Sequence, residues 1–490
     1  MAYFNKTTKA YSIYYLFLFL ILFVFFYQVH PLIPFDTDDW MYMGLARPPY
    51  PSIYQWNPTK LFPELLQPLL GMFAAFIVTP IVGDYIGALV ATHAFVVSLF
   101  ITVYFYSIQK VLNLRFRISP LSGFSIITIV LLLHFIALKT RSFNNDHLFF
   151  SEDVNCYYNY IVPNLLCACL VMWLICHDTH TIKSYRTLGV LYYLTFLALF
   201  SNLYSSVILV AYVGANLIFD LYGSDKKEKG WLMKFILRNT FFLSIILIWL
   251  AVQLFEVNGV RANAYGYIEL PFGQSLNKTF FYLFRRLRIN GWFLLFTFTI
   301  FVSAKIYHFF KNKRNILYLG RLHGILILAM FLAITYLLLL SSRVFPNYMI
   351  KSDVLLSYLF FFLLLIALCM GYLCFKLSFF KLLFPFIIFF FFFQINIKEN
   401  TFKDVQFFHG TDIQTCRTID NEIINQVKTA DYLGNDTVTI MVHNYNEFTN
   451  WPMKMDDAQY IGITLHKHGV IKRNIVTIFE RMSEEPRMKE

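Results

Sequence analysis

Residues 10–40 of the chain read AYSIYYLFLFLILFVFFYQVHPLIPFDTDDW. The first twenty of these residues carry no charge, and two lysines precede them. A run of about 20 apolar residues is long enough to cross a bilayer as a helix, and no small-residue cleavage site follows it. We therefore expect a retained spanning helix over 10–29. Charged side chains are costly inside hydrocarbon, so Asp36, Asp38 and Asp39 must lie beyond its end, at the membrane surface.

The composition places most of the chain in a membrane. Of the 490 residues, 58% are hydrophobic and 14% are charged, and the mean hydropathy is +0.56, whereas soluble domains carry about 25% charged residues. The seven Cys residues lack the paired spacing of disulfide frameworks and zinc sites. The formal charge of +12 is explained by the Lys and Arg residues in loops that set membrane topology. We therefore expect no nucleic-acid partner.

Ten further uncharged segments are candidates for spanning helices. They run over 85–107, 119–138, 157–176, two halves of 187–219, 240–255, 289–304, 322–342, 354–375 and 382–397. We divide 187–219 at Ser201-Asn202, because polar residues there fit a tight turn. The apolar segment 65–83 contains Pro68 and Pro80, and we interpret it as a helix lying in the outer interface.

The distribution of basic residues predicts the orientation. With eleven spans, and with the C-terminal tail left out of the count, the inner segments hold 19 Lys and Arg residues and the outer loops hold 11. Because cytoplasmic loops carry the excess of positive charge, we expect a cytoplasmic N-terminus in the inner membrane. The three aspartates and the end of the chain then lie on the extracytoplasmic side.

Two domains follow from this pattern. Residues 1–397 are expected to form an all-α polytopic membrane domain with a catalytic outer loop over 30–64. Residues 398–490 are more polar, and they are expected to form a small extracytoplasmic α/β domain packed on the outer face. Its predicted elements are a helix over 419–433, a strand over 437–442, a helix over 459–468 and a strand over 474–479.

The early aspartates are the main candidates for chemistry. A carboxylate cluster at the mouth of a helical bundle can act as a general base or as a set of metal ligands. The alternative is structural, because Asp favours helix N-termini and a short helix can open at Trp40. Glu152 and Asp153, after the third span, form a second acidic arm.

The outer loops also supply binding candidates. These are Arg47, Lys60, Glu64, Arg285, Arg286, Arg288 and Arg343. Arginine offers a fixed fork of donors that matches phosphate oxygens. The alternatives are snorkelling toward lipid head groups and ordinary charges that flank a span.

This layout resembles the GT-C superfamily of membrane glycosyltransferases. The resemblance consists of a first span followed by the outer motif Asp36-Thr37-Asp38-Asp39, an interfacial helix, a second acidic loop at Ser151-Glu152-Asp153 and an outer C-terminal domain. It implies that Asp38 and Asp39 are the catalytic acids, with Asp36 as the alternate. It also implies an inverting transfer from a polyprenyl-phosphate sugar donor to a glycan or lipid-linked glycan acceptor, as in enzymes that modify bacterial surface polysaccharide or O-antigen.

Two features limit what the resemblance implies. The chain lacks the Trp-Trp-Asp sequence of oligosaccharyltransferases, which argues against protein N-glycosylation. We assign no metal ligands, although converging carboxylates are compatible with a divalent cation such as Mg²⁺ or Mn²⁺.

Two other functions remain open. A polysaccharide polymerase or ligase would depend on the outer arginines and not on the early aspartates. A flippase or transporter of lipid-linked glycan would move its substrate without chemistry. Transporters of protons or ions place charged groups at mid-membrane depth, and the spans hold few ionisable residues besides His93, His134 and Glu256.

Overall fold

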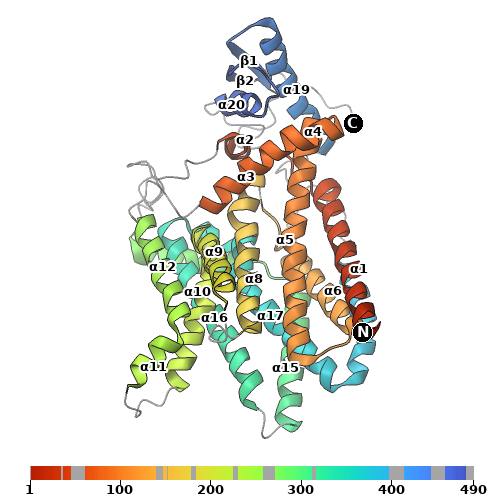
Figure 1. Cartoon of the computed structure of the whole chain (residues 1–490), viewed down its shortest axis with the longest axis vertical. Coiled ribbons are helices and arrows are strands. Elements are labelled where there is room, and N and C mark those ends of the chain that lie inside the picture. The colour runs from red at the N-terminus through yellow and green to blue at the C-terminus, as the bar shows by residue number, and fades with distance from the viewer. Residues whose placement is uncertain are drawn as a thin grey trace.

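The computed structural model describes residues 2–34, 37–45, 61–139, 147–151, 153–177, 184–223, 230–257, 271–311, 316–396, 413–442 and 458–481. These residues form a large helical bundle with a small α/β unit at one end (Figure 1). The bundle helices are α1 (Ala2–Val24) with η1 (Phe25–Val29), α5 (Tyr85–Phe116), α6 (Pro120–Ile136), α7 (Val154–Cys156) with η4 (Tyr157–Ile161) and α8 (Val162–Cys176), α9 (Tyr185–Leu199), α10 (Leu203–Gly223), α12 (Thr240–Val257), α15 (Gly291–Lys311), α16 (Ile316–Arg343), α17 (Ser352–Lys376) and α18 (Phe384–Asn396).

Within the described residues, nine helices are long and apolar enough to cross a membrane. A tenth candidate is a pair, α11 (Trp231–Arg238) with α12, bent by 75°. Each of the eleven predicted segments is helical, but α6 and α9 have only 17 and 15 residues. The chain is thus an all-α polytopic membrane protein, and the number of spans stays a prediction.

Local sequence explains two of the helix boundaries. The predicted turn at Ser201-Asn202 is confirmed: α9 ends at Leu199, α10 begins at Leu203, and Asn202 Oδ1 accepts a hydrogen bond from the Tyr204 amide at 2.8 Å. At the start of α5, Asp84 accepts a hydrogen bond from the Gly87 amide at 2.8 Å. Asp and Asn side chains satisfy the unpaired amides at such positions.

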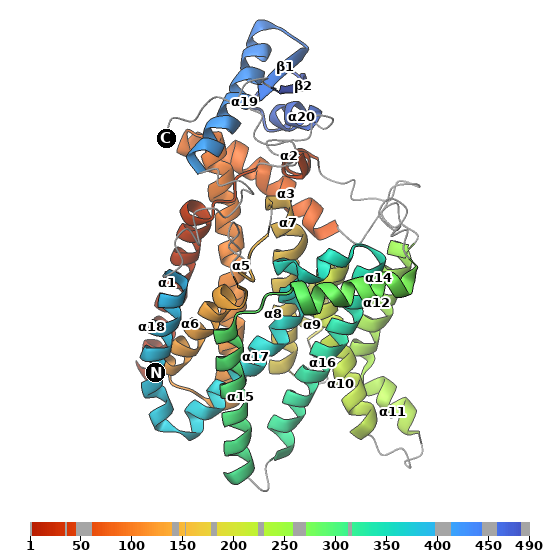
Figure 2. The same cartoon turned by 180° about the vertical axis from the view of Figure 1, so that it is seen from behind.

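The segment Leu61–Val82 is one of the nine candidates by length and hydropathy. It consists of α3 (Leu61–Phe73), η3 (Ala74–Val78) and α4 (Thr79–Val82). Figures 1 and 2 show it lying across the end of the bundle, and not alongside α5. This arrangement is the one expected of a helix at the membrane surface.

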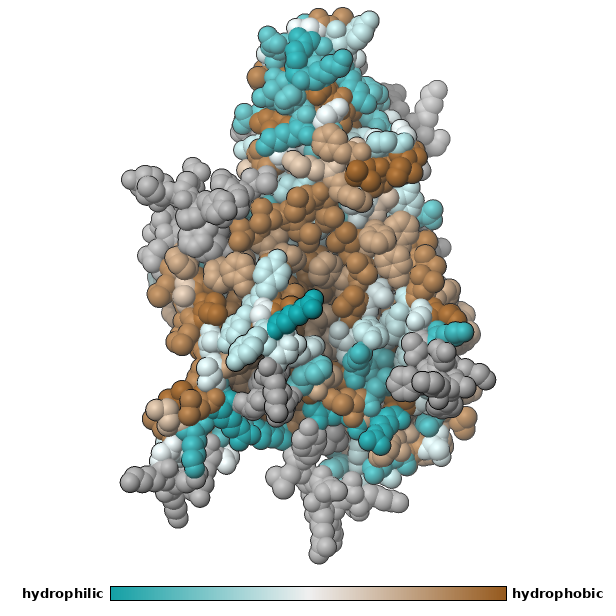
Figure 3. All heavy atoms as spheres, in the orientation of Figure 1, coloured by the Kyte–Doolittle hydropathy of each residue, from teal (hydrophilic) through white to brown (hydrophobic). Residues whose placement is uncertain are grey.

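The centre of the bundle is α17: the most apolar stretch of this helix is 94% buried, whereas the segment Ser378–Ile395, which includes most of α18, is only 17% buried. Hydrophobic side chains also cover much of the outside of the bundle, and hydrophilic ones gather on the C-terminal unit and toward the opposite end (Figure 3). Lipid tails are as apolar as these side chains, so close packing and polar contacts between helices hold such a bundle together.

The C-terminal unit contains α19 (Ile413–Leu433), β1 (Thr437–Val442), α20 (Gln459–Lys467) and β2 (Val476–Arg481). The two helices and two strands predicted for this region are confirmed, with small shifts at their ends. The strands pair in parallel, with Thr437 opposite Val476. The helices α19 and α20 share one hydrophobic core with the end of the bundle, so the unit is packed directly on the membrane domain.

Candidate functional site

The early aspartates lie on a short helix, α2 (Thr37–Gly44), at the end of the bundle that carries the C-terminal unit (Figure 1). Asp39 is fully buried, and its Oδ1 accepts a hydrogen bond from the Asn155 amide at 2.7 Å. Asp38 is exposed, and its Oδ2 lies 3.5 Å from Asn155 Nδ2. The two neighbouring carboxylates therefore have different environments: that of Asp39 is buried and accepts a backbone hydrogen bond, whereas that of Asp38 is exposed.

Asn155 belongs to the first turn of the long helix Val154–Cys176, formed by α7, η4 and α8. Asp153 caps the same helix by accepting a hydrogen bond from the Cys156 amide. Carboxylates are favourable at a helix N-terminus because its free amides carry partial positive charge. The structure thus joins the first acidic motif to the second one through a single helix end.

A buried polar network continues from this helix end into the centre of the bundle. Ser151 donates a hydrogen bond to Asp353 Oδ2 at 2.6 Å, and Asn164 Nδ2 donates to the Asp353 carbonyl at 2.6 Å. Asp353 is 1% exposed and opens α17. Sequence reasoning missed Asn155 and Asp353; the available signal was the pair Lys351 and Asp353, opposite charges directly before an apolar run.

Lys351 connects this network to the basic segments. Its Nζ lies 5.8 Å from the ring centre of Tyr160, in η4, and 5.4 Å from that of Tyr348. Tyr348 belongs to η7 (Pro346–Ile350), which packs against η6 (Tyr282–Arg286). The helix preceding η6, α14 (Phe272–Phe281), packs against α16 and η7 and lies across the bundle in Figure 2.

The predicted arginines lie on these elements. Arg285 and Arg288 are exposed, and the guanidinium of Arg343 lies 4.3 Å from the ring centre of Phe272. Within the described residues, none of these three arginines has an ion-pair partner. The Arg288 carbonyl accepts a hydrogen bond from the Lys139 amide at 2.7 Å, so the segment before α15 is pinned to the end of α6.

The remaining candidates are only partly described. Asp36, Arg47, Lys60 and Glu152 lie outside the described residues, as does the side chain of Arg286. Glu64 is on α3 and is 1% exposed. Its carboxylate is therefore shielded from solvent, and its role in binding the substrate stays a prediction.

A second polar cluster, also missed from sequence, lies next to the acidic loops. His30 Nδ1 is 3.4 Å from His147 Nε2, and His30 Nε2 is 3.2 Å from the Tyr157 hydroxyl. Burial lowers the pKa of His147 to about 3 and that of His30 well below its usual value. Both imidazoles are therefore neutral at physiological pH, and the cluster connects the end of the first span to the start of the long helix.

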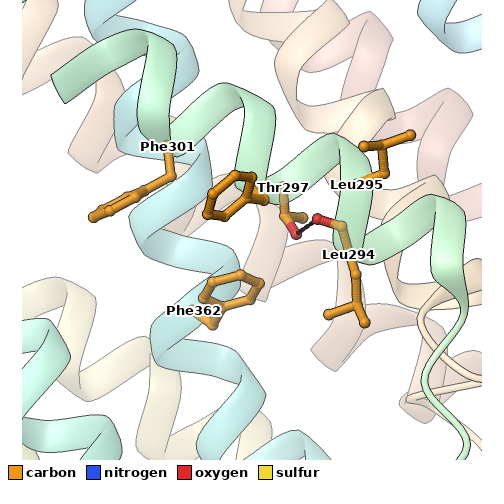
Figure 4. Close-up of a pocket in the computed structure, with 6 residues that line it drawn as sticks. Leu294, Leu295, Thr297, Phe301 and Phe362 are labelled. Carbon is orange, nitrogen blue, oxygen red and sulfur yellow. Dashed lines mark hydrogen bonds between the residues drawn. The ribbon is translucent and has the colours of Figure 1, made fainter. Parts of the chain in front are cut away.

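An apolar groove lies between α15 and α17 (Figure 4). Its volume is about 500 Å³. The lining side chains are Leu294, Leu295, Thr297, Phe298, Phe301 and Phe362. The Thr297 hydroxyl is turned to its own helix, where it donates to the Phe293 and Leu294 carbonyls at 2.7 and 3.2 Å. The groove therefore offers hydrocarbon contacts, and its first lining residue, Leu294, follows Arg288 by six positions in the chain.

A metal ion requires ligand side chains in a particular arrangement. No group of three His, Cys, Asp or Glu side chains is arranged as a cation site in the described part of the chain. Asp36 and Glu152 belong to the same two acidic loops but lie outside that part, so Mg²⁺ or Mn²⁺ stays a proposal.

No family model, no curated protein and no solved structure matches this chain.

Proposed function

We propose that the protein is a membrane glycosyltransferase of the GT-C type. In this proposal it transfers a sugar from a polyprenyl-phosphate donor to a hydroxyl of a surface glycan or lipid-linked glycan, on the outer face of the cytoplasmic membrane. The observation that carries the proposal is the exposed Asp38 carboxylate, held beside a buried second carboxylate at the end of the bundle. Arg285 and Arg288, which have no ion-pair partner among the described residues, lie in the segment that is pinned to the C-terminal end of α6.

The chemistry requires a base and a stabilised leaving group. Asp38 takes the proton of the acceptor hydroxyl while that oxygen forms a bond to the anomeric carbon. The bond between the anomeric carbon and the phosphate oxygen breaks, and polyprenyl phosphate leaves with the electron pair. Arg285 and Arg288 supply donors for the phosphate oxygens, whose charge increases in the transition state. A displacement in one step inverts the configuration at the anomeric carbon.

The groove between α15 and α17 gives the donor a place for its lipid tail. Hydrocarbon lines the groove, and Arg288 precedes its first lining residue by six positions in the chain. A polyprenyl phosphate has the same order of groups, with an anionic head next to a long apolar chain. Such a donor needs no nucleotide pocket.

The test is transfer by purified protein in liposomes containing a polyprenyl-phosphate sugar and an acceptor, together with glycan analysis of cells. We expect Asp38→Asn to abolish transfer and to change the glycan profile. Asp436→Asn is the matched control, because the Asp436 side chain is 91% exposed on the C-terminal unit. An unchanged profile in Asp38→Asn cells would remove this residue from the mechanism and favour a polymerase or ligase. Movement of lipid without a glycosidic product would favour a flippase.

A further inference from the structure

The helix that carries Asp38, α2, is too short to be stable and fixed in place without contacts to other elements. α2 has only 8 residues, and isolated helices shorter than about 12 residues are marginal in water. One end is fixed by the hydrogen bond between Asp39 and the Asn155 amide. The other end, at Gly44, therefore needs a separate contact if Asp38 is to stay in one place.

Two elements supply it: α3, which packs against α2 within the membrane domain, and α20 of the C-terminal unit. The Thr464 hydroxyl donates to the Trp40 carbonyl at 2.6 Å. The helices α2 and α20 touch at Gly44, where a Cβ atom would lie 2.1 Å from Thr464 Oγ1 and 2.8 Å from Thr464 Cα. A glycine is thus required at this point of α2, because any side chain would push α20 away.

His468, just after α20, completes the contact. Its Nε2 lies 3.1 Å from the Met43 carbonyl, and its Nδ1 lies 2.6 Å from the Tyr85 hydroxyl. The Met43 carbonyl is one of the last four of α2, which have no partner within the helix. Since a carbonyl only accepts, Nε2 carries the proton, and Nδ1 accepts from Tyr85. A single buried imidazole therefore ties α2 to α5.

We infer that the C-terminal unit is part of the catalytic machinery and fixes α2, with Thr464 and His468 as positioning residues for Asp38. The catalytic part of this inference rests on the proposed function, but the docking of α20 on α2 can be measured without any assay of activity. The unit touches α2 through carbonyls and a close glycine contact. It acts on the reaction through the helix and not through the substrate.

The experiment combines hydrogen exchange with kinetics on the full chain in nanodiscs. The variants are Thr464→Val and His468→Phe, which keep shape and remove hydrogen bonds. Thr464→Ser keeps the hydrogen-bond donor, and Thr439→Val makes the same chemical change as Thr464→Val at an exposed position of β1.

We expect amide exchange over 37–45 to rise about tenfold in Thr464→Val and His468→Phe, with exchange in α17 unchanged as the control for folding. We expect kcat to fall about tenfold with KM nearly unchanged, because a small misplacement of a catalytic group costs rate. Thr464→Ser and Thr439→Val should behave as wild type.

Three results would contradict either the inference about α2 or the proposed function. Unchanged exchange over 37–45 in both Thr464→Val and His468→Phe would overturn the inference, whatever the activity. Faster exchange with unchanged kcat would also overturn it, because α2 would then be docked without serving the reaction. Absence of transfer in the wild type would contradict the proposed function alone, and the exchange data would still show whether the C-terminal unit fixes α2.

Discussion

At the scale of single residues, the adjacent Asp38 and Asp39 are expected to have opposite roles. Asp39 is buried and accepts a backbone hydrogen bond, so Asp39→Ala should lower the free energy of unfolding by about 1 to 2 kcal/mol, as removal of a helix cap does. Asp38 is exposed, so Asp38→Ala should leave stability unchanged and remove activity. Thermal unfolding in detergent, followed for both variants, tests this difference. Equal destabilisation by the two variants would contradict it.

The arginines before α15 give a second prediction at this scale. Arg285 and Arg288 are exposed and have no ion-pair partner among the described residues. If they bind the donor phosphate, the double change Arg285→Ala/Arg288→Ala should raise KM for the donor at least about tenfold, because hydrogen bonds between charged groups contribute about 1.5 to 3 kcal/mol each. Lys278→Ala, on α14, is the control for a general loss of surface charge. Equal effects of the two changes would favour snorkelling to lipid.

The burial of Asp39 shows why this scale is hard to predict from sequence. The motif marks a candidate site, which stays a prediction. The short helix predicted to open at Trp40 is present, but it starts three residues earlier, at Thr37. However, which carboxylate is engaged depends on Asn155, which is 116 positions away in the chain. No local pattern contains that information.

At the scale of elements, the groove between α15 and α17 should recognise the donor by its tail. Leu294→Trp would fill the groove next to its start. We expect transfer from a long polyprenyl donor to fall about tenfold and transfer from a short, water-soluble isoprenoid analogue to stay within about twofold of wild type, because only the long chain buries apolar surface there. Leu247→Trp is the control, at an exposed position of α12. Equal loss with both donors would exclude the groove as the tail site.

The contact between α20 and α2 should weaken in acid. Burial lowers the pKa of His468 to about 4, against about 6.5 in an unfolded chain. His468 therefore binds a proton more readily when α20 is not docked on α2 than when it is docked. As a result, the contribution of His468 to docking is complete above pH 6.5 and is lost as pH falls toward 4. Protection of the amides over 37–45, taken relative to the intrinsic exchange rate at each pH, should fall as pH is lowered across this range in wild type and less so in His468→Phe.

The other titratable groups at this contact must be separated from His468. Burial raises the pKa of Asp420 well above its usual value. Its effect has the opposite sign, since the folded state holds this proton more tightly and docking gains from lower pH. His93 of α5 and Lys467 also face His468. The difference between wild type and His468→Phe isolates the imidazole, and identical pH profiles would show that it does not titrate in this range.

Elements were more predictable than contacts between them. The boundary at Ser201-Asn202 and the strand at Thr437–Val442 follow from polar turn residues and from a β-rich apolar run. Apolar runs alone did not predict the length of each helix, because α6 has only 17 residues and α12 is bent by 75° against α11. The docking of α20 on α2 could not be predicted, because it depends on Gly44 and Thr464, which belong to no recognisable sequence motif and lie far apart in the chain.

At the scale of the whole molecule, the proposal requires the acidic and basic groups to share one aqueous face. Within the protein, the segment with Arg288 is pinned to the end of α6, and Lys351 reaches the helix whose N-terminus binds Asp39. These contacts place both groups toward the same end of the bundle. Lys110 lies near the other end of α5, after the segment that the charge pattern assigns to the membrane.

Cysteine labelling of intact cells tests this arrangement. In a background without the seven native cysteines, Asp38→Cys and Arg288→Cys should react with a membrane-impermeant maleimide added outside. Lys110→Cys should react only after the membrane is made permeable, because α5 separates it from Asp38. The lipid donor presents its phosphate to one leaflet, and a base on the other side of about 30 Å of hydrocarbon could not reach the anomeric carbon. Labelling of positions 38 and 288 from opposite sides would therefore end the proposal, even if both variants lost activity.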